Sequence, residues 1–266
     1  VGVVLFLTRS WSDRAIGVAA VVLLLQPVEW YHYIANLINP AHRLPGLKVA
    51  EMYGEVADYT KAGNWRDFLL GNVTLGQKAS FLWAVNAGRF VQTAGLFLLG
   101  FFIGRKQLFM TNEKNIVFWT KVLIISAISF APLYTLKELV MENDPIVQQT
   151  VGTAFDMWQK LAFTLVLVAS FILLYQHKNF SKAVAGLRFY GKMSLTNYIS
   201  QSIIGAFIYF PIGLNLAPYC GYTLSLSVGF LIFLLQLRFC KWWLARHKQG
   251  PLEYIWHKCT WIGTGK

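Results

Sequence analysis

Residues 116–136 read IVFWTKVLIISAISFAPLYTL, a run in which one lysine is the only charged side chain. A helix of about 20 mostly apolar residues is long enough to cross the hydrocarbon core of a bilayer. Similar apolar runs recur along the chain, and we predict six complete spans at residues 15–37, 81–103, 116–136, 153–175, 194–211 and 222–243. The predicted fold is an all-α, polytopic transmembrane helical bundle.

The composition of the whole chain supports this interpretation. Of the 266 residues, 56% are hydrophobic and only 14% are charged, with a mean hydropathy of +0.46, whereas soluble domains are about a quarter charged. Tryptophans gather near the ends of the expected spans, as an aromatic belt would require. These positions include Trp11, Trp30, Trp65, Trp242 and Trp256. The lipid bilayer is therefore the first partner that the sequence predicts.

Positive charge is concentrated in every second loop, which predicts an orientation because Lys and Arg are retained on the cytoplasmic side. One set of loops holds 16 of the 24 basic residues: Arg9, Arg14, Arg105, Lys106, Lys114, Lys121, Lys178, Lys182, Arg188, Lys192 and six more from Arg238 to Lys266. The opposite loops carry the acids Glu51, Glu55, Asp58, Asp67, Glu142 and Asp144. We therefore expect a multi-pass protein of the bacterial inner membrane with a cytoplasmic C-terminus.

We expect a single helical membrane domain over residues 1–266 that is incomplete at its N-terminus. Residues 1–7 lie within an apolar run that has no initiator Met, and we interpret them as one partial span whose beginning is missing. No internal repeat of 20–50 residues is visible.

Two polar sections flank or interrupt the expected spans. Residues 39–78 are predicted to form an extracytoplasmic section with short amphipathic helices at 47–59 and 65–73. Residues 246–266 are basic and amphipathic, and we expect this tail to lie along the cytoplasmic interface, where its positive charge meets anionic lipid.

Several function classes are disfavoured. The net charge of +12 is explained by topology, and no nucleic-acid-binding signature accompanies it, so nucleic acid is not expected as a partner. Cys220, Cys240 and Cys259 show no CxxC spacing and no pairing with His at metal-ligand spacing, so we predict neither a metal site nor a disulfide framework. No Walker A, GxSxG, HExxH or dinucleotide motif occurs.

The first group of candidate site residues is Gln26, Glu29, His32 and Tyr33. Residues 26, 29 and 33 share a helical face, and 29 and 32 are neighbours. Pro27 opens the helix and frees backbone carbonyls. A polar group at bilayer depth costs about 2.5–3.5 kcal/mol, so such groups are functional candidates. The alternative is that the span ends here and these side chains lie among lipid headgroups.

A second group comprises Asn86, Arg89, Gln92 and Thr93, again spaced on one face. Antiparallel neighbours would place Arg89 and Glu29 at similar depth, so we expect an ion pair between them. That pair would be either purely structural or part of an anion or carboxylate site built on Arg89.

A third group is Thr196, Asn197 and Gln201, with Ser194 and Ser200 beside them. Asn197 and Gln201 are four residues apart and share a face. Hydroxyls and amides of this kind hold helices together in lipid, so helix packing is the main alternative to a functional role.

Two stretches carry a resemblance to a known family. Residues 191–202 read GKMSLTNYISQS and residues 249–256 read QGPLEYIW. Both resemble signatures of the YeiB-like bacterial inner-membrane proteins, and Thr196, Asn197 and Gln201 lie in the first. The likeness extends from about residue 59 to 262. Family members usually have Trp where Tyr254 stands and Arg where His257 stands, and they begin with further helices that this chain lacks.

The resemblance implies a protein whose shared domain has no known function. The family is grouped with multi-span membrane acyltransferases that acylate sugars at the far membrane face from a cytoplasmic acyl donor. The catalytic residues of those relatives lie mainly in N-terminal helices, so no catalytic residue transfers to a position here.

Three hypotheses follow. The first is acyl transfer to a cell-envelope glycan or small metabolite, with acyl-CoA as co-substrate and no bound cofactor. The second is a transporter or permease for a small solute, ranked lower because no repeat is visible. The third is a structural or signalling partner. The sequence does not determine the oligomeric state.

Overall fold

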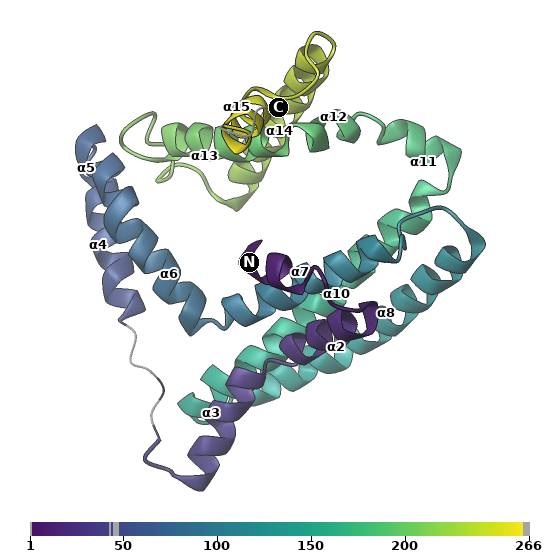
Figure 1. The fold of residues 1–266 in the computed structure, drawn as a ribbon. Coiled ribbons are helices and arrows are strands. Elements are labelled where there is room, and N and C mark those ends of the chain that lie inside the picture. The colour runs from purple at the N-terminus through teal and green to yellow at the C-terminus, as the bar shows by residue number, and fades with distance from the viewer. Residues whose placement is uncertain (1, 43, 45–47, 263–266) are drawn as a thin grey trace. The chain divides into compact units, whose positions relative to one another are not determined.

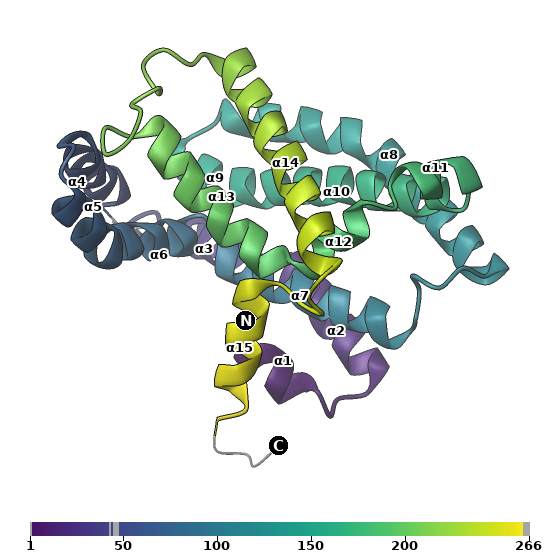
Figure 2. The same cartoon turned by 90° about the horizontal axis from the view of Figure 1, so that it is seen from above.

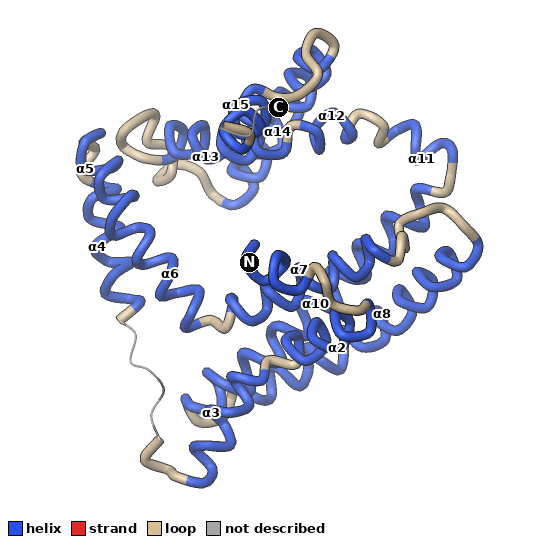
Figure 3. Tube along the Cα trace, in the orientation of Figure 1, coloured by secondary structure: helices blue, strands red, loops and turns tan. Residues whose placement is uncertain are grey.

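The computed structural model describes residues 2–42, 44 and 48–262. These residues form helices joined by loops and turns, without a strand among them, which confirms the all-α prediction (Figure 3). Val1, Leu47 and residues 263–266, which belong to predicted segments, lie outside the described residues. The chain divides into two compact units, residues 1–50 with 78–177 and residues 51–77 with 178–266. That it acts as one membrane domain stays a prediction.

The first unit is built on two packed pairs of helices. Figure 1 shows α8 and α10 side by side, and α2 against α7. Its elements are α1 (Gly2–Thr8), α2 (Asp13–Leu24), α3 (Pro27–Ile38), most of α6 (Gln77–Asn86), α7 (Arg89–Arg105), α8 (Glu113–Met141), α9 (Pro145–Val147), the π-helix η2 (Gln148–Gly152) and α10 (Thr153–Tyr175). Ile16, Ala20 and Leu98 form the buried centre of the α2–α7 contact.

Side-chain hydrogen bonds fix where these helices begin and how they join. The Asn112 side chain accepts from the Asn115 amide at 2.8 Å and so caps α8. In turn, Asn115 Nδ2 donates to the Gln107 and Met110 carbonyls, and buried Trp119 donates from Nε1 to the Leu108 carbonyl at 2.8 Å. These bonds hold the loop between α7 and α8 against the start of α8.

The second unit contains the remaining helices. They are most of α4 (Val49–Lys61), α5 (Trp65–Gly71), the π-helix η1 (Asn72–Gly76), α11 (Lys178–Ala183), α12 (Leu187–Lys192), α13 (Ser194–Tyr209), α14 (Tyr222–Leu244) and α15 (Pro251–Thr260). Helix α12 packs on α14, and α15 packs on α13; Figure 2 shows α15 beside the start of α13. The expected amphipathic helices at 47–59 and 65–73 correspond to α4 and α5, which are separated by a turn at Gly63.

Helix length and apolarity support a membrane protein. Three described segments are long and apolar enough to cross a bilayer: α8, the run from Pro145 to Tyr175, and α14. Two bent pairs raise this number to five if each pair is one span: α2 with α3, and Trp65–Asn86 with α7. The fifth predicted span corresponds to α13, whose 16 residues are fewer than a span usually has. The total of six spans therefore stays a prediction.

Candidate functional site

The first expected span is broken at Gln26. Helix α2 ends at Leu24, α3 begins at Pro27, and their axes differ by 48°. Between them Gln26 adopts a left-handed conformation, with φ 58° and ψ 57°, which costs a non-glycine residue about 1–2 kcal/mol. Trp158 of α10 compensates the break, because its Nε1 donates to the Leu24 carbonyl at 2.8 Å. The break that Pro27 predicts is confirmed.

A second break divides the expected span at 81–103. Helix α6 ends at Asn86 and α7 begins at Arg89, with a bend of 77° and a left-handed Gly88 (φ +60°) between them. A Cβ on Gly88 would lie 2.8 Å from Glu29 Oε1 and 3.5 Å from Gln26 Oε1. Glycine is favoured here because the positive φ strains other residues, and a Cβ would displace the Glu29 carboxylate from the backbone of the second break.

A third irregularity adjoins the two breaks. Residues 148–152 form the π-helix η2, which packs on α3. Single π-helical turns are often found at functional sites because they redirect side chains within a helix. The side chain of Gln149, in this turn, lines the same cavity as Glu29. No sequence signal indicated η2.

These irregular segments surround a cavity of about 100 Å³ within the first unit. Its lining residues are Val28, Glu29, His32, Leu44, Val85, Asn86 and Gln149. The structure therefore brings the first two sequence groups together, from α3 and from the end of α6. Gln26, Arg89 and Gln92 do not line the cavity and lie at or just after the two breaks. We call Gln26, Glu29, His32, Asn86 and Gln149 the cavity cluster.

Two members of the cavity cluster are buried without partners. Glu29 is 7% exposed and Gln26 is 1% exposed. Among the described residues, no group donates a hydrogen bond to the Glu29 carboxylate and no basic nitrogen lies within 4.0 Å of it. Both polar atoms of the Gln26 side chain also lack a partner within the described part of the chain. Burial of unpaired polar or charged groups is costly, so this arrangement suits binding better than packing.

The expected ion pair between Glu29 and Arg89 does not form. Arg89 Nη1 donates instead to Gln92 Oε1 at 2.9 Å, and the guanidinium lies over the Trp83 ring at 5.6 Å. Arg89 and Gln92 are one turn apart on α7, so a local contact replaces the expected contact between helices. Arg89 Nε is buried and has no hydrogen-bond partner in the described chain.

His32 has a partner that the sequence did not indicate. Its Nδ1 lies 3.1 Å from His42 Nε2, and the two rings stack with centroids 5.4 Å apart. The His42 carbonyl accepts from Asn36 Nδ2 at 3.3 Å. One of the two ring nitrogens must carry the shared proton. No cluster of three or more His, Cys, Asp or Glu side chains suited to a metal ion occurs in the described ranges.

The third sequence group lies in the second unit, where Thr196, Asn197 and Gln201 form side-chain hydrogen bonds to other helices. The Glu253 carboxylate of α15 accepts from the Thr196 amide at 3.1 Å and from Thr196 Oγ1, at the N-terminus of α13. Thr196 Oγ1 accepts from the Leu252 amide at 3.2 Å. Burial acts to raise the pKa of Glu253, but the bonds from Thr196 outweigh it and hold that pKa below its usual value. Glu253 thus caps α13 from another helix.

Further bonds link the same helix to α12 and α14. Asn197 Nδ2 donates to the Tyr190 carbonyl at 3.0 Å and contacts Cys240 Sγ at 3.3 Å. Gln201 Nε2 donates to Gln236 Oε1 at 3.0 Å and to the Tyr190 hydroxyl. We call Thr196, Asn197, Gln201, Gln236 and Glu253 the motif cluster. Because its members satisfy one another, the packing interpretation is favoured here.

One group of paired charges was not predicted from the sequence. Asp156 of α10 pairs with Lys137 of α8 at 3.4 Å and with Lys160 one turn further along α10. The Asp156–Lys160 spacing of four was visible as two charges inside the span expected at 153–175. Lys137 belongs to the preceding helix, and sequence spacing does not reveal that it contacts Asp156. Asp156 is paired with both lysines, and its contact with Lys137 links α8 to α10.

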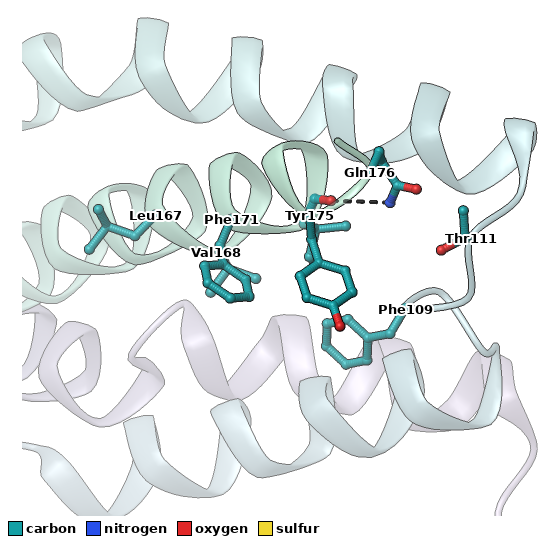
Figure 4. A pocket seen from close by; sticks show the side chains of 8 residues that line it. Phe109, Thr111, Leu167, Val168, Phe171, Tyr175 and Gln176 are labelled. Carbon is teal, nitrogen blue, oxygen red and sulfur yellow. Dashed lines mark hydrogen bonds between the residues drawn. The ribbon is translucent and has the colours of Figure 1, made fainter. Parts of the chain in front are cut away.

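A larger, apolar hollow lies elsewhere in the first unit. Its volume is about 590 Å³, and Figure 4 shows Phe109 and Tyr175 facing it beside Phe171 and Leu167 of α10. The lining contains neither a carboxylate nor an imidazole. Such a surface suits hydrocarbon chains of lipid, so the smaller polar cavity is the candidate functional site.

Comparison with curated proteins finds relatives without a known activity. One is the "Uncharacterized protein YxaH" of Bacillus subtilis (strain 168), 25% identical over 95 residues, which are 36% of this chain and 24% of the relative. Another is the "Uncharacterized 39.9 kDa protein in amylase 3'region" of Bacillus acidopullulyticus, 37% identical over 91 residues, or 34% of this chain and 25% of the relative. The chain thus matches about a quarter of each relative's length. No solved structure matches it.

A family match covers more than half of the chain. It extends over residues 103–263 and therefore includes the motif cluster, but not Gln26, Glu29, His32 or Asn86 of the cavity cluster. The family is described as "Protein of unknown function". The chain belongs to the DUF418 family of proteins of unknown function.

Proposed function

We propose that this DUF418 chain is part of a polytopic protein of the bacterial inner membrane, within the YeiB-like group, with six spans and a cytoplasmic C-terminus. The long apolar helices α8, α10 and α14 support a membrane location. The alternation of loop charge supports the orientation, and the signatures at 191–202 and 249–256 support the YeiB-like assignment.

The function that the geometry supports best is binding and translocation of a small polar solute at the cavity cluster. The observation that carries this proposal is the contact between two helix breaks, with Gly88 packed on Glu29 and Gln26. Discontinuous spans that meet at polar groups are typical of secondary transporters, where irregular backbone is tolerated beside a cavity. From the sequence we ranked transport below acyl transfer, because no internal repeat is visible. The two helix breaks that meet at polar side chains are the reason for placing transport first.

The breaks also provide a means of movement. Left-handed residues at element ends can absorb changes in φ and ψ while the adjoining helices move as rigid bodies. Gln26 and Gly88 occupy such positions at the ends of α2 and α6. Solute exchange would then involve rotation of α3 and α6 about these residues.

Uptake of a small-solute library into proteoliposomes that contain the complete protein tests this proposal. We expect accumulation above empty liposomes, and Gly88→Ala should abolish it because the new methyl group collides with Glu29. Gly100→Ala on α7 is the matched control, since its methyl group would meet no atom within 4 Å. Equal uptake by the two variants, or uptake of no solute, would contradict the proposal.

Acyl transfer is the second candidate, because two groups able to accept a proton line the same cavity. Glu29 and His32 are one turn apart on α3. A hydroxyl of an envelope glycan or small metabolite would lose its proton to one of them and attack the thioester carbonyl of acyl-CoA. The new C–O bond would replace the C–S bond, and the CoA thiolate would leave.

Labelled acetyl-CoA distinguishes the two candidates. Label passed to an envelope glycan by the complete protein, and lost in His32→Ala, would favour acyl transfer. Solute uptake without label transfer would favour transport. His247→Ala, at an exposed site in the second unit, controls for nonspecific loss of an imidazole.

A further inference from the structure

We propose that the solute of this cavity carries a positively charged amino group, which Glu29 binds as its counter-ion. This inference rests on the proposed binding of a small solute at the cavity cluster. It adds the charge and chemical class of the ligand, a small primary ammonium compound.

The first argument is the isolation of the Glu29 carboxylate. It is 7% exposed, and within the described ranges it has neither an ion-pair partner nor a hydrogen-bond donor. A carboxylate removed from water without compensation is strongly destabilising, whereas a ligand cation in contact with it restores the missing interaction. The side chain is therefore arranged for an external cation.

The second argument is the charge of the other groups around Glu29. On α3, His32 is engaged with His42; across the cavity, Asn86 and Gln149 are neutral amides. Arg89 of α7 is directed to Gln92 and the Trp83 ring. Among the described residues, the lining of the cavity therefore carries one ionisable acid, Glu29, and no Lys or Arg, although the chain has a net charge of +12. An anionic ligand would face Glu29 without a cation in the lining to balance it.

The third argument is the arrangement of acceptors. Glu29, Asn86 and Gln149 line the same cavity, so one carboxylate and two amide oxygens are available there as acceptors. A primary ammonium group has three N–H donors and no acceptor, as a lysine side chain has. It can donate to the Glu29 carboxylate and to an amide oxygen of Asn86 or Gln149. The cavity volume of about 100 Å³ suits a molecule of a few heavy atoms.

Equilibrium binding to the complete protein in lipid nanodiscs tests the proposal. The probes are ethylammonium, neutral ethanol and acetate, measured by calorimetry and by the shift in melting temperature. We expect saturable binding of ethylammonium alone. Glu29→Gln should weaken it by on the order of tenfold or more, because the charge pair is lost while the shape is kept. Glu138→Gln, an exposed acid on α8, is the matched control and should bind as the wild type does.

Two results would overturn the inference: binding of ethanol or acetate as tight as that of ethylammonium, or unchanged ethylammonium binding in Glu29→Gln. If Glu29→Gln does not fold, Glu29→Asp replaces it; this variant should keep the preference for ethylammonium over ethanol with reduced affinity, and loss of that preference would count against the proposal.

Parallel uptake assays separate this inference from the proposed transport. Binding of ethylammonium without uptake would refute transport and leave the inference standing. Uptake of neutral solutes that is unchanged in Glu29→Gln would support transport and refute the inference.

Discussion

The cavity cluster of the first unit and the motif cluster of the second are built from the same kinds of side chain, yet they differ in hydrogen bonding. In the motif cluster, Glu253 accepts two bonds from Thr196, and Gln236 bonds Gln201. In the cavity cluster, both polar atoms of the buried Gln26 side chain lack a partner in the described part of the chain, and no described residue donates a hydrogen bond to the buried Glu29 carboxylate. A satisfied polar network specifies how helices pack, whereas an unsatisfied one has free capacity for a ligand.

The comparison changes how the family signatures are interpreted. The stretches at 191–202 and 249–256 supply Thr196, Asn197, Gln201 and Glu253, and these residues bond to one another or to α12 and α14. The signatures are therefore explained by the docking of α15 on α13. Of the cavity cluster, only Gln149 lies within the matched region; Gln26, Glu29, His32 and Asn86 lie outside it.

The largest effect on the motif cluster is expected from Gly250→Ala. A Cβ at this position would lie 2.1 Å from Glu253 Oε2 and 3.0 Å from Met193 Cγ, so Glu253 must leave Thr196. We expect a loss of about 2–3 kcal/mol in the free energy of unfolding, measured by denaturant titration. Gly221→Ala, with no atom within 4 Å of the new methyl group, should change it by less than about 0.5 kcal/mol. Similar losses in both variants would refute the capping role.

Thr196→Val should have a smaller effect in the same direction. It removes the hydroxyl that bonds Glu253 but keeps the side-chain shape. The expected loss in the free energy of unfolding is about 1–2 kcal/mol. Thr120→Val on α8, which removes an exposed hydroxyl bonded to its own helix, should be close to neutral in the same titration.

The pH dependence of the motif cluster should follow from Glu253. Its pKa is lower in the folded protein than its ordinary value of 4.5. The carboxylate therefore stabilises the fold above about pH 4.5, and this contribution is lost as the pH falls through the lowered value. Unfolding measured between pH 6 and pH 3 should show the loss in the wild type and less of it in Thr196→Val. An identical slope in both would contradict this assignment.

The smallest change in stability is expected for Glu29→Gln, and any change should be a gain, whereas the preceding substitutions reduce stability. The substitution removes an unpaired buried charge and keeps its volume, so the melting temperature should stay the same or rise while solute binding falls. Glu253→Gln is the matched substitution in the motif cluster, and it should lower the melting temperature. If the melting temperature fell by a similar amount in both variants, the proposed difference between the two clusters would be refuted.

Local patterns predicted much of the fold. Apolar runs indicated α8, α10 and α14, and Pro27 indicated the break after α2. Gly88 gave no comparable signal, because a glycine within a helical run is compatible with a continuous helix until a contact such as that with Glu29 is known. The π-helix η2 also left no pattern.

The sequence named Gln26, Glu29, His32 and Asn86 of the cavity cluster as candidates, but it gave no indication of Gln149 or of the contacts between these residues. Helical spacing identified Glu29, His32 and Asn86, and the structure places them around one cavity. Spacing could not show that Arg89 pairs locally with Gln92, because similar depth in the bilayer does not specify how a long side chain is directed. Contacts between distant segments, such as Gln236 with Gln201, have no local signature either.

The most direct test is to measure ethylammonium binding to the complete protein in nanodiscs for the wild type, Glu29→Gln and Thr196→Val together. We predict that Glu29→Gln binds ethylammonium more weakly and has an unchanged melting temperature. Thr196→Val should have a lower melting temperature and unchanged ethylammonium binding. Retained binding in Glu29→Gln, or equal loss of binding in both variants, would contradict the division between a ligand site and a structural network.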